Sequence, residues 1–364
     1  MDSAPKTAGD VVREYLAAKG WGQADLAHVV GKTTAAINEI IQGKREISAE
    51  MAALFAAAFG NTAEFWLTLD PRVSNEKLAY AKRRARLFEL APVREMIRRG
   101  WINPSDDLAE LENELKKFFG VDSFDTAPTL PVVTRRSEPM EPLTPSQLAW
   151  CFKARNLAAD IIAPPYSESR FPELEAHLKQ LVAQAPSVKR VAKTLFAFGI
   201  RFVIVQPLTD LKIDGAAMWL DENKPVIAMS LRMDRIDSFW FTLLHECMHI
   251  KYRDGLSVDS NLTGEDADFS AAKPAFERRA DADAAAAIIP QDQINSFIKR
   301  IAPLYSKERI IQFANRIRVH PGIIVGQLQH RGEIRFSANR EMLVKIREKV
   351  LPTSVVDGWG NTIA

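Results

Sequence analysis

The chain has 364 residues, of which 47% are hydrophobic, and this length predicts two or three domains with room for hydrophobic cores. Lys and Arg number 48 and Asp and Glu 46, so the overall charge gives no argument for nucleic-acid binding. The two cysteines, Cys151 and Cys247, indicate no disulfide framework, and no apolar run is long enough to span a bilayer. Without an apolar signal core at the N-terminus, we expect a soluble, cytoplasmic protein.

Apolar residues recur at helical spacing through residues 8–70. Two short helices are predicted, at residues 23–27 and 34–41, with the tight turn Gly31-Lys32-Thr33 between them. Helix, glycine-bearing turn and helix is the arrangement in which the second helix enters the major groove of DNA. A small helical bundle used for dimerisation or partner docking is the alternative.

The residues that define this segment further are Gly20-Trp21, Gln23, Asp25-Leu26-Ala27, Gly31, Ile37, Glu39-Ile40-Ile41, Gly43-Lys44, Ile47, Ala58-Phe59-Gly60 and Glu64-Phe65-Trp66-Leu67. They resemble the Cro/repressor-like helix-turn-helix of HigA-type antitoxins. The resemblance implies a double-stranded DNA operator as partner and a homodimer on a palindromic site. The candidate DNA contacts are Gln23, Lys32, Thr33, Thr34, Asn38, Glu39, Lys44 and Arg45. The long polar and basic members of this set fit phosphate contacts better than base readout.

Residues 76–145 are predicted to form a helical connector followed by a Pro-rich linker, between a DNA-binding domain at residues 1–75 and a second domain at residues 146–364. The connector carries a basic run, which indicates a solvated helix face or else a DNA-flanking or partner-binding surface: Lys82, Arg83, Arg84, Arg86, Arg94, Arg98 and Arg99.

The second domain is predicted to begin with helices and then to form three strands, at residues 200–206, 212–220 and 225–230. A short sheet of this kind offers an edge to which an extended substrate can add as a strand. Asp234 is expected to cap the helix that follows the sheet. The fold class expected is therefore mostly α with a small β-sheet.

That following helix, residues 239–253, carries a His-Glu-x-x-His motif. His245 and His249 are four residues apart and share a helix face, and Glu246 lies beside them. This pattern is typical of two zinc ligands and a general base. The flanks are apolar, so the helix should be buried, and buried histidines and glutamate require partners. A core helix with two hydrogen-bonded histidines is the alternative.

A catalytic zinc keeps three protein ligands, so another ligand is expected downstream. Residues 275–290 favour a helix that ends at Pro290, and Glu277 and Asp281 share one face of it. Glu277 can ligate the metal, and Asp281 can hold the far N–H of a ligating histidine. The alternative for Glu277 is a surface pair. The polar residues 254–274 fit equally a mobile lid over the site or a loop without a role.

The Phe-Thr-Leu-Leu-His-Glu helix and the later Glu-x-x-Ala-Asp, Glu277 to Asp281, together resemble the ImmA/IrrE-like metallopeptidases. The resemblance implies a zincin-like domain with Zn2+ on His245, His249 and Glu277 and with Glu246 as base. Cys247 and Met248 stand where family members commonly have Leu-Gly, and we expect Cys247 to pack rather than ligate.

Two residues are candidates for stabilising an oxyanion, namely Tyr252 and His320. His320 precedes Pro321, so a helix N-cap is the other interpretation of it.

The sequence thus predicts a transcriptional regulator that carries a zinc endopeptidase, active or latent, whose substrate is another regulator or a toxin–antitoxin partner. Zinc would lower the pKa of its bound water toward about 7, and Glu246 would take the proton as the water attacks a peptide carbonyl. The alternative function is a non-proteolytic, HigA-like antitoxin or repressor with a structural or sensory metal site.

Overall fold

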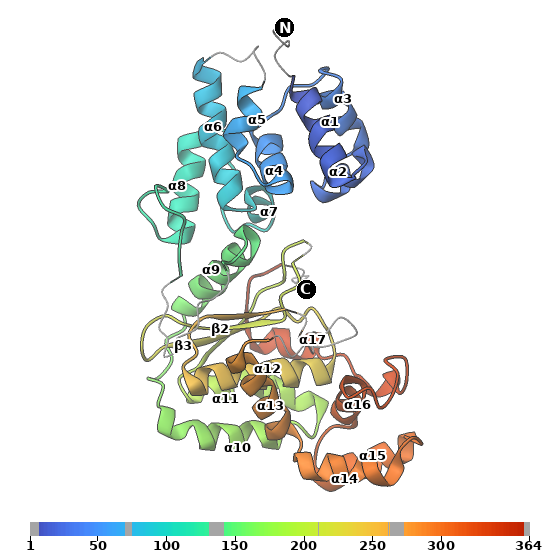
Figure 1. Cartoon of the computed structure of the whole chain (residues 1–364). Coiled ribbons are helices and arrows are strands. Elements are labelled where there is room, and N and C mark those ends of the chain that lie inside the picture. Colours follow the sequence, from blue (N-terminus) through green and yellow to red (C-terminus); the bar gives the residue numbers. More distant parts are fainter. Residues whose placement is uncertain are drawn as a thin grey trace. The chain divides into compact units, whose positions relative to one another are not determined.

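The structure is a computed structural model that describes residues 7–69, 75–130, 142–209, 211–260, 262 and 273–359, with side chains from residue 79 in the second of these ranges. The chain divides into two compact units, residues 1–128 and 129–364 (Figure 1). Residues 131–141 of the Pro-rich linker, and residues 261 and 263–272 of the polar segment, lie outside the described residues.

The described part of the first unit is helical. Its helices are α1 Ala8–Lys19, α2 Gln23–Val29, α3 Thr34–Ile41, α4 Ala49–Phe59, α5 Ala63–Thr68, α6 Asn75–Leu90, α7 Val93–Arg98 and α8 Leu108–Phe119. Hydroxyl N-caps begin several of them, because a side-chain oxygen satisfies a free N–H of the first turn: Thr33 accepts from Ala36 and Ser48 from Met51. The core between the helices includes the fully buried Leu26, Ile37 and Trp66.

The segment predicted as a connector packs as part of this first unit. Helix α6 contacts α4 and α5, and its Ala85 is fully buried in the same core as Trp66. The first compact unit therefore extends to Pro128 and does not end at residue 75. The reason is that the apolar face of α6 covers α4 and α5. The many basic residues on the rest of this helix make the segment look like a solvated connector in the sequence.

The second unit combines helices with a five-stranded sheet, as the expected α+β class requires. Its helices are α9 Pro145–Ala159, α10 Phe171–Leu181, α11 Val191–Ala197, α12 Ile236–Tyr252, α13 Ala275–Ile288, α14 Gln291–Ile301, α15 Lys307–Ile317, α16 Pro321–His330 and α17 Arg347–Val350, with 3-10 turns at Glu168–Arg170, Ala185–Arg190, Arg340–Met342 and Leu351–Thr353. The strands are β1 Arg201–Ile204, β2 Gly215–Trp219, β3 Pro225–Met229, β4 Ser257–Asp259 and β5 Val355–Val356, in the order β4-β2-β3-β1-β5. Strand β2 is antiparallel to β3 and β4, and β1 is parallel to β3 and β5.

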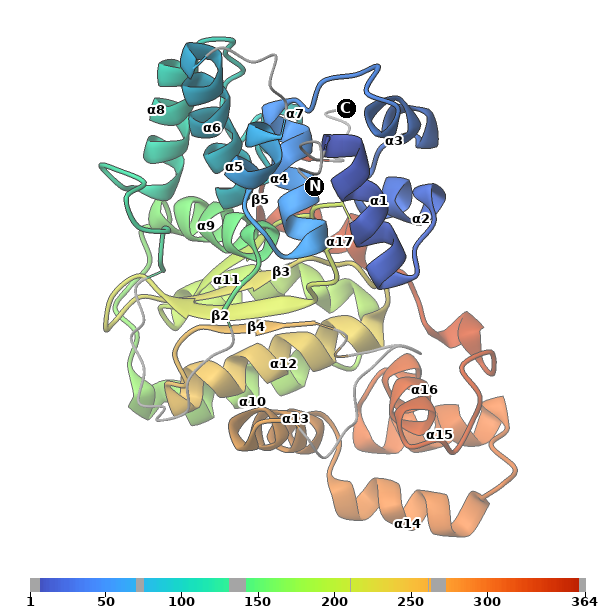
Figure 2. The ribbon, with the colours of Figure 1, turned by 45° about the horizontal axis from the view of Figure 1, so that its top comes forward.

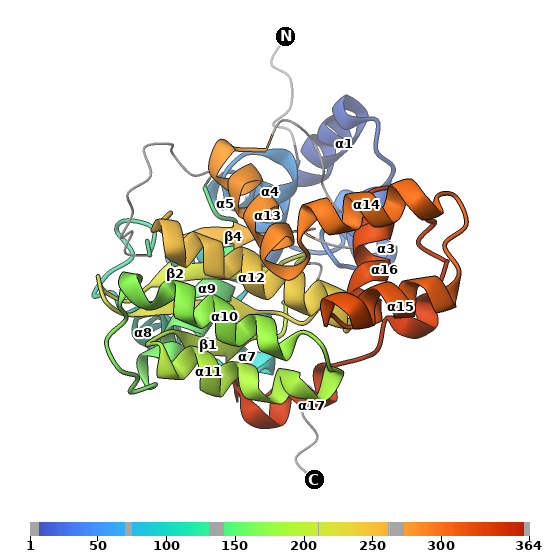
Figure 3. The same ribbon diagram turned by 90° about the horizontal axis from the view of Figure 1, so that it is seen from below.

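The sheet supports helix α12 on one of its faces. Helix α9 covers the opposite face, and α11 lies on the same side as α12 (Figures 1 and 2). Helix α13 packs along α12, and α16 packs on α12 as well (Figure 3). Residues from Ile236 to Ile250 are consequently all buried, including the polar ones.

Two expectations about local structure are wrong. The polar segment 254–274 contains strand β4, which occupies the sheet edge beside β2. Asp234 does not cap α12, whose N-cap residue is Arg235 and which begins at Ile236 without a side-chain cap. Its Oδ1 instead accepts the backbone N–H groups of Ile346, at 2.9 Å, and Arg347, at 2.7 Å, at the start of α17. The choice between the two helix starts depends on contacts distant in sequence.

Among the described residues, no helix has the length and apolar character needed to cross a membrane.

Candidate metal centre and nucleic-acid interface

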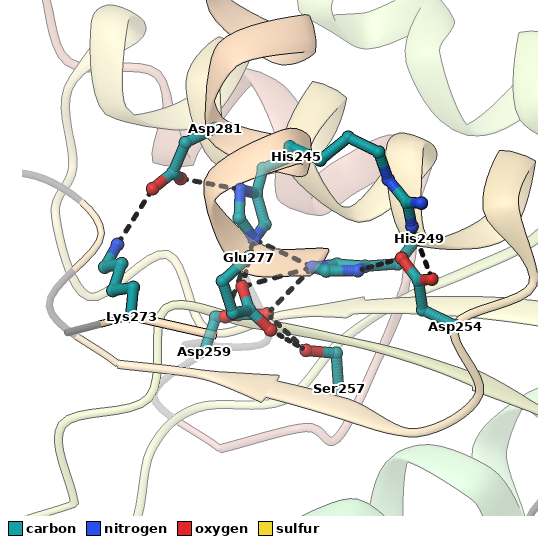
Figure 4. A network of polar contacts seen from close by, with 9 residues as sticks. His245, His249, Asp254, Ser257, Asp259, Lys273, Glu277 and Asp281 are labelled. Atoms are coloured by element: carbon teal, nitrogen blue, oxygen red, sulfur yellow. Dashed lines mark hydrogen bonds and ion pairs between the residues drawn. The ribbon is translucent and has the colours of Figure 1, made fainter. Parts of the chain in front are cut away.

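The centre is built on α12, where His245 and His249 lie one turn apart and are both fully buried. The burial follows from the position of the helix between the sheet, α13 and α16. The Nε2 atoms of the two imidazoles lie 2.9 Å apart (Figure 4). The shared face that the four-residue spacing predicts is therefore present, and both rings point to one place.

Helix α13 brings Glu277 to the same place. Its Oε2 lies 3.2 Å from Nε2 of His245 and 3.4 Å from Nε2 of His249. The expectation that a downstream helix supplies a third donor thus agrees with the geometry. The other carboxylate oxygen, Oε1, accepts a hydrogen bond from the Ser257 hydroxyl at 2.8 Å.

A fourth donor, Asp259, joins them from strand β4. Its Oδ1 lies 3.5 Å from Nε2 of His245, and its Oδ2 lies 3.8 Å from Nε2 of His249. One donor atom from each of these four residues lies within 4.8 Å of the others, so the group could hold a metal ion. Sequence reasoning assigned Asp259 to a polar loop. The signal available was its position at the end of Ser-Val-Asp, a stretch with the alternation of a short strand.

The far side of each imidazole faces a carboxylate. Nδ1 of His249 lies 3.0 Å from Oδ2 of Asp254, and the other oxygen of this carboxylate, Oδ1, accepts a hydrogen bond from Arg279 at 2.6 Å. Nδ1 of His245 lies 2.9 Å from Oδ1 of Asp281, although the approach is not aligned as a hydrogen bond. Asp281 therefore stands where the sequence placed it, behind a histidine. Carboxylates at Nδ1 favour protons on these nitrogens and leave both Nε2 atoms as lone-pair donors.

The donor set fits a divalent cation such as zinc. Two imidazole lone pairs and two carboxylates converge in a buried space, and without a positive charge they would repel one another. Zinc binds nitrogen and oxygen at about 2.0–2.2 Å, which puts tetrahedral donors roughly 3.3–3.6 Å apart. The measured separations of 2.9, 3.2, 3.4, 3.5 and 3.8 Å span this value. Nitrogen and carboxylate ligands suit zinc and several other transition metals.

The titration behaviour of the centre reflects the same crowding of opposite charges. Burial works to lower the pKa of His249, but the carboxylates of Asp254 and Glu277 outweigh it and the pKa rises above its ordinary value. Burial works to raise the pKa of Glu277, but the two histidines hold it well below its ordinary range. The side chains around this point therefore stabilise a positive charge on or between the two imidazoles, next to the ionised carboxylate of Glu277.

Glu246, the predicted base, is fully buried, and neither of its carboxylate oxygens has a hydrogen-bond partner among the described residues. Burial raises its pKa well above the ordinary value, and the charge of Asp259 adds to the effect. The carboxylate lies against Gly215 of β2, where a Cβ atom would stand 2.3 Å from Oε1. A buried carboxylate without a hydrogen-bond partner lowers the stability of the folded protein.

Other residues named from the sequence have different partners. His320 is the N-cap of α16, and its Nδ1 accepts the Gly322 N–H at 3.1 Å. The Tyr252 hydroxyl donates to Asp283 at 2.5 Å. These partners lie outside the donor group, and a role of either side chain in stabilising an oxyanion stays a prediction. Cys247 is fully buried and packs in the hydrophobic core, as expected.

In the first unit, α2 and α3 contact each other and form the helix–turn–helix arrangement. Thr34 and Lys44 are exposed, whereas Gln23 is half-buried and Thr33 caps α3. Asn38 accepts a hydrogen bond from Gln42.

Several basic candidates of this unit are already paired. Lys32 contacts Glu50 at 2.6 Å, and Arg45 contacts Glu39 at 3.3 Å. In the basic run, Lys82, Arg83, Arg94 and Arg99 form ion pairs with Glu64, Glu112, Glu50 and Glu95, respectively. Much of the run therefore serves contacts within the unit, which agrees with a helix face more than with a continuous DNA-flanking surface.

Comparison with known protein families finds a match within the first unit. Residues 12–66 match the family described as Helix-turn-helix, HTH_3. No curated protein and no solved structure matches the chain. The family match covers α2 and α3 together with the turn between them. Residues 12–66 therefore form a helix-turn-helix, and this N-terminal unit supports a DNA-binding regulator.

Proposed function

We propose that the protein is a DNA-binding regulator whose second unit is a zinc-dependent endopeptidase of the ImmA/IrrE-like type. The observation that carries the proposal is the combination of two imidazoles and Glu277 around one point with the unpartnered carboxylate of Glu246 on the same helix. A purely structural metal site needs donors but has no use for a buried acid whose carboxylate lacks a hydrogen-bond partner.

The roles of the residues follow from their positions. His245, His249 and Glu277 would hold the zinc, while Asp254 and Asp281 orient the histidines. Zinc bound there would supply Lewis-acid activation of water and of the substrate carbonyl. Glu246 would accept the proton of the attacking water and deliver it to the leaving amine. Its raised pKa suits a group that must both take and release a proton.

The substrate we propose is a protein, either another regulator or a toxin–antitoxin partner. Strand β4 lies at the edge of the sheet beside the donors, so an extended segment of the substrate would reach the site by pairing along that edge. The helix-turn-helix unit would direct the protein to an operator as a symmetric dimer.

Metal content tests the centre. We expect about one zinc per chain in the purified protein and a loss of zinc in His249→Ala and Glu277→Ala variants, because each removes one donor of a small set. Elemental analysis of the dialysed proteins measures this. A wild-type protein that holds no metal even after zinc is added would refute the proposal.

Glu246→Gln tests the peptidase separately from the metal. The amide keeps the size of the side chain but cannot accept the proton, so we expect hydrolysis to fall by about 10²–10⁴-fold while zinc and DNA binding remain. Peptide-bond cleavage is followed on candidate regulators by mass spectrometry, and regulation is followed in cells. If the variant keeps every cellular effect, the second candidate function is favoured.

That second function is a repressor or antitoxin-like protein whose metal is structural or sensory. The observation that favours it is Asp259, since four protein donors are typical of structural zinc.

The DNA-binding assignment is tested by Lys44→Ala combined with Arg45→Ala. Both side chains are exposed just after α3, and Arg45 contacts Glu39 at 3.3 Å whereas Lys44 forms no ion pair within the described part of the chain. We expect weaker operator binding and a smaller dependence on salt, because phosphate contacts release counterions. Fluorescence anisotropy at several salt concentrations measures this, and unchanged affinity would contradict the assignment.

A further inference from the structure

The carboxylate of Asp259 lies close to the Nε2 atoms of both histidines. It is 6% exposed, and its two carboxylate oxygens approach different imidazoles, at 3.5 and 3.8 Å. These separations are comparable to those of Glu277, at 3.2 and 3.4 Å. Asp259 is therefore placed as a metal donor in much the same way as Glu277, both in its distance from the imidazoles and in its burial.

The backbone fixes this position. Asp259 pairs with Gly215 across the β4–β2 ladder, and its carbonyl accepts the Asp214 N–H at 2.8 Å. Gly215 is the residue whose missing side chain leaves room for the Glu246 carboxylate. The same pair of strands therefore places Asp259 next to the donors and next to the base, in the region where a water molecule must stand for Glu246 to act on it.

The side-chain contacts of Asp259 are weaker than those of Glu277. A serine hydroxyl has one proton, and Ser257 lies 2.8 Å from Glu277 but 3.2 Å from Asp259. Glu277 is thus the better acceptor of that proton. Among the described residues, no Lys or Arg forms an ion pair with Asp259. A cation bound by the two histidines would be its main stabilising partner.

We infer that Asp259 is a fourth protein ligand of the metal and occupies the coordination position that hydrolysis requires, so that this conformation is closed to substrate. This inference rests on the metal site of the proposed function and adds its regulation. A catalytic zinc keeps one position open, whereas a closed four-ligand set does not. Activity would then require the carboxylate of Asp259 to be exchanged for water while His245, His249 and Glu277 stay.

The test uses the full-length protein loaded with Co2+, whose visible absorption reports its ligands. We expect the spectrum of the wild type to remain unchanged when acetohydroxamate is added, because no position is open. The spectrum of Asp259→Ala should change on the same addition. The zinc affinity of this variant should fall by at least about tenfold, because removing even a residue that only hydrogen-bonds to a ligand costs about that much. Asp283→Asn, which alters a carboxylate outside the donor group, should behave as the wild type.

Two results would overturn the inference: a wild-type spectrum that responds to acetohydroxamate as readily as the variant does, or a zinc affinity that Asp259→Ala leaves unchanged. If Asp259→Ala does not fold, Asp259→Asn keeps the side-chain shape and the wild-type titration alone still decides. If the spectra behave as expected but Asp259→Ala cleaves no peptide, the fourth ligand stands and the peptidase proposal fails.

Discussion

At the scale of single residues, the centre depends on the groups behind the donors. Asp254 touches no metal donor atom of the group directly but holds Nδ1 of His249 at 3.0 Å, while Arg279 holds Asp254. Burial of the histidine without this partner would leave the ring free to turn and its proton free to choose either nitrogen. The orientation of the donors is thus a property of side chains from separate segments.

We predict that Asp254→Asn lowers zinc affinity by about 10–100-fold, because a neutral amide aligns and polarises the imidazole less well. Competition with a chromophoric chelator measures the affinity. Asp283→Asn is the control, since its partner is Tyr252 and it lies outside the donor group. Equal affinities in the two variants would show that Asp254 does not orient His249.

We also predict that Gly215→Ala destabilises the protein by about 1–3 kcal/mol, the typical cost of overpacking a core. The new methyl group would meet Oε1 of Glu246 at 2.3 Å and Cγ2 of Thr242 at 2.9 Å. The stiff Thr242 side chain cannot turn away freely. Urea unfolding of the variant and the wild type measures the change. Equal stability of the two proteins would contradict the close packing of Gly215.

At the scale of elements, helix starts and strands are decided by partners that lie far along the chain. Asp234 illustrates this, because it precedes α12 in sequence yet caps the start of α17, more than a hundred residues later. Strand β4 is another example, since three residues form a strand only because β2 offers its edge.

We predict that Asp234→Ala lowers the free energy of unfolding by about 0.5–2 kcal/mol, the cost of losing a side-chain cap. Two N–H groups, of Ile346 and Arg347, would lose their acceptor. Chemical unfolding followed by circular dichroism gives the value. Asp160→Ala, an exposed position at the end of α9, should change stability by less than about 0.5 kcal/mol, and a loss at Asp234 no larger than this would rule out the cap.

At the scale of the whole molecule, the chain forms two units whose boundary is set by packing and not by composition. Helices α4, α5 and α6 share one core, so the DNA-binding unit includes residues that look like a charged connector. Residues 129–364 enclose a separate core around α12.

We predict that a fragment of residues 1–128 folds cooperatively, whereas a fragment of residues 1–75 melts at a lower temperature or stays partly unfolded. The shorter fragment would expose the surfaces of α4 and α5 that α6 covers, with Ala85 removed from the core. Thermal melting by circular dichroism compares the two. A short fragment as stable as the long one would show that α6 is dispensable to the core.

The sequence by itself determined what depends on near neighbours. The spacing of His245 and His249 places them on one helix face, Pro290 ends the next helix, and the β-branched run after residue 200 forms a strand, because these are consequences of local geometry.

Only the tertiary structure decided which distant groups meet those local elements. It brought Asp259 on β4 to the two histidines, placed Asp254 behind His249, and assigned His320 and Tyr252 to partners outside the donor group. A carboxylate in a polar segment looks the same in sequence whether it faces solvent or a buried imidazole. The difference arises from strand pairing and burial, which act between residues that the chain itself keeps apart.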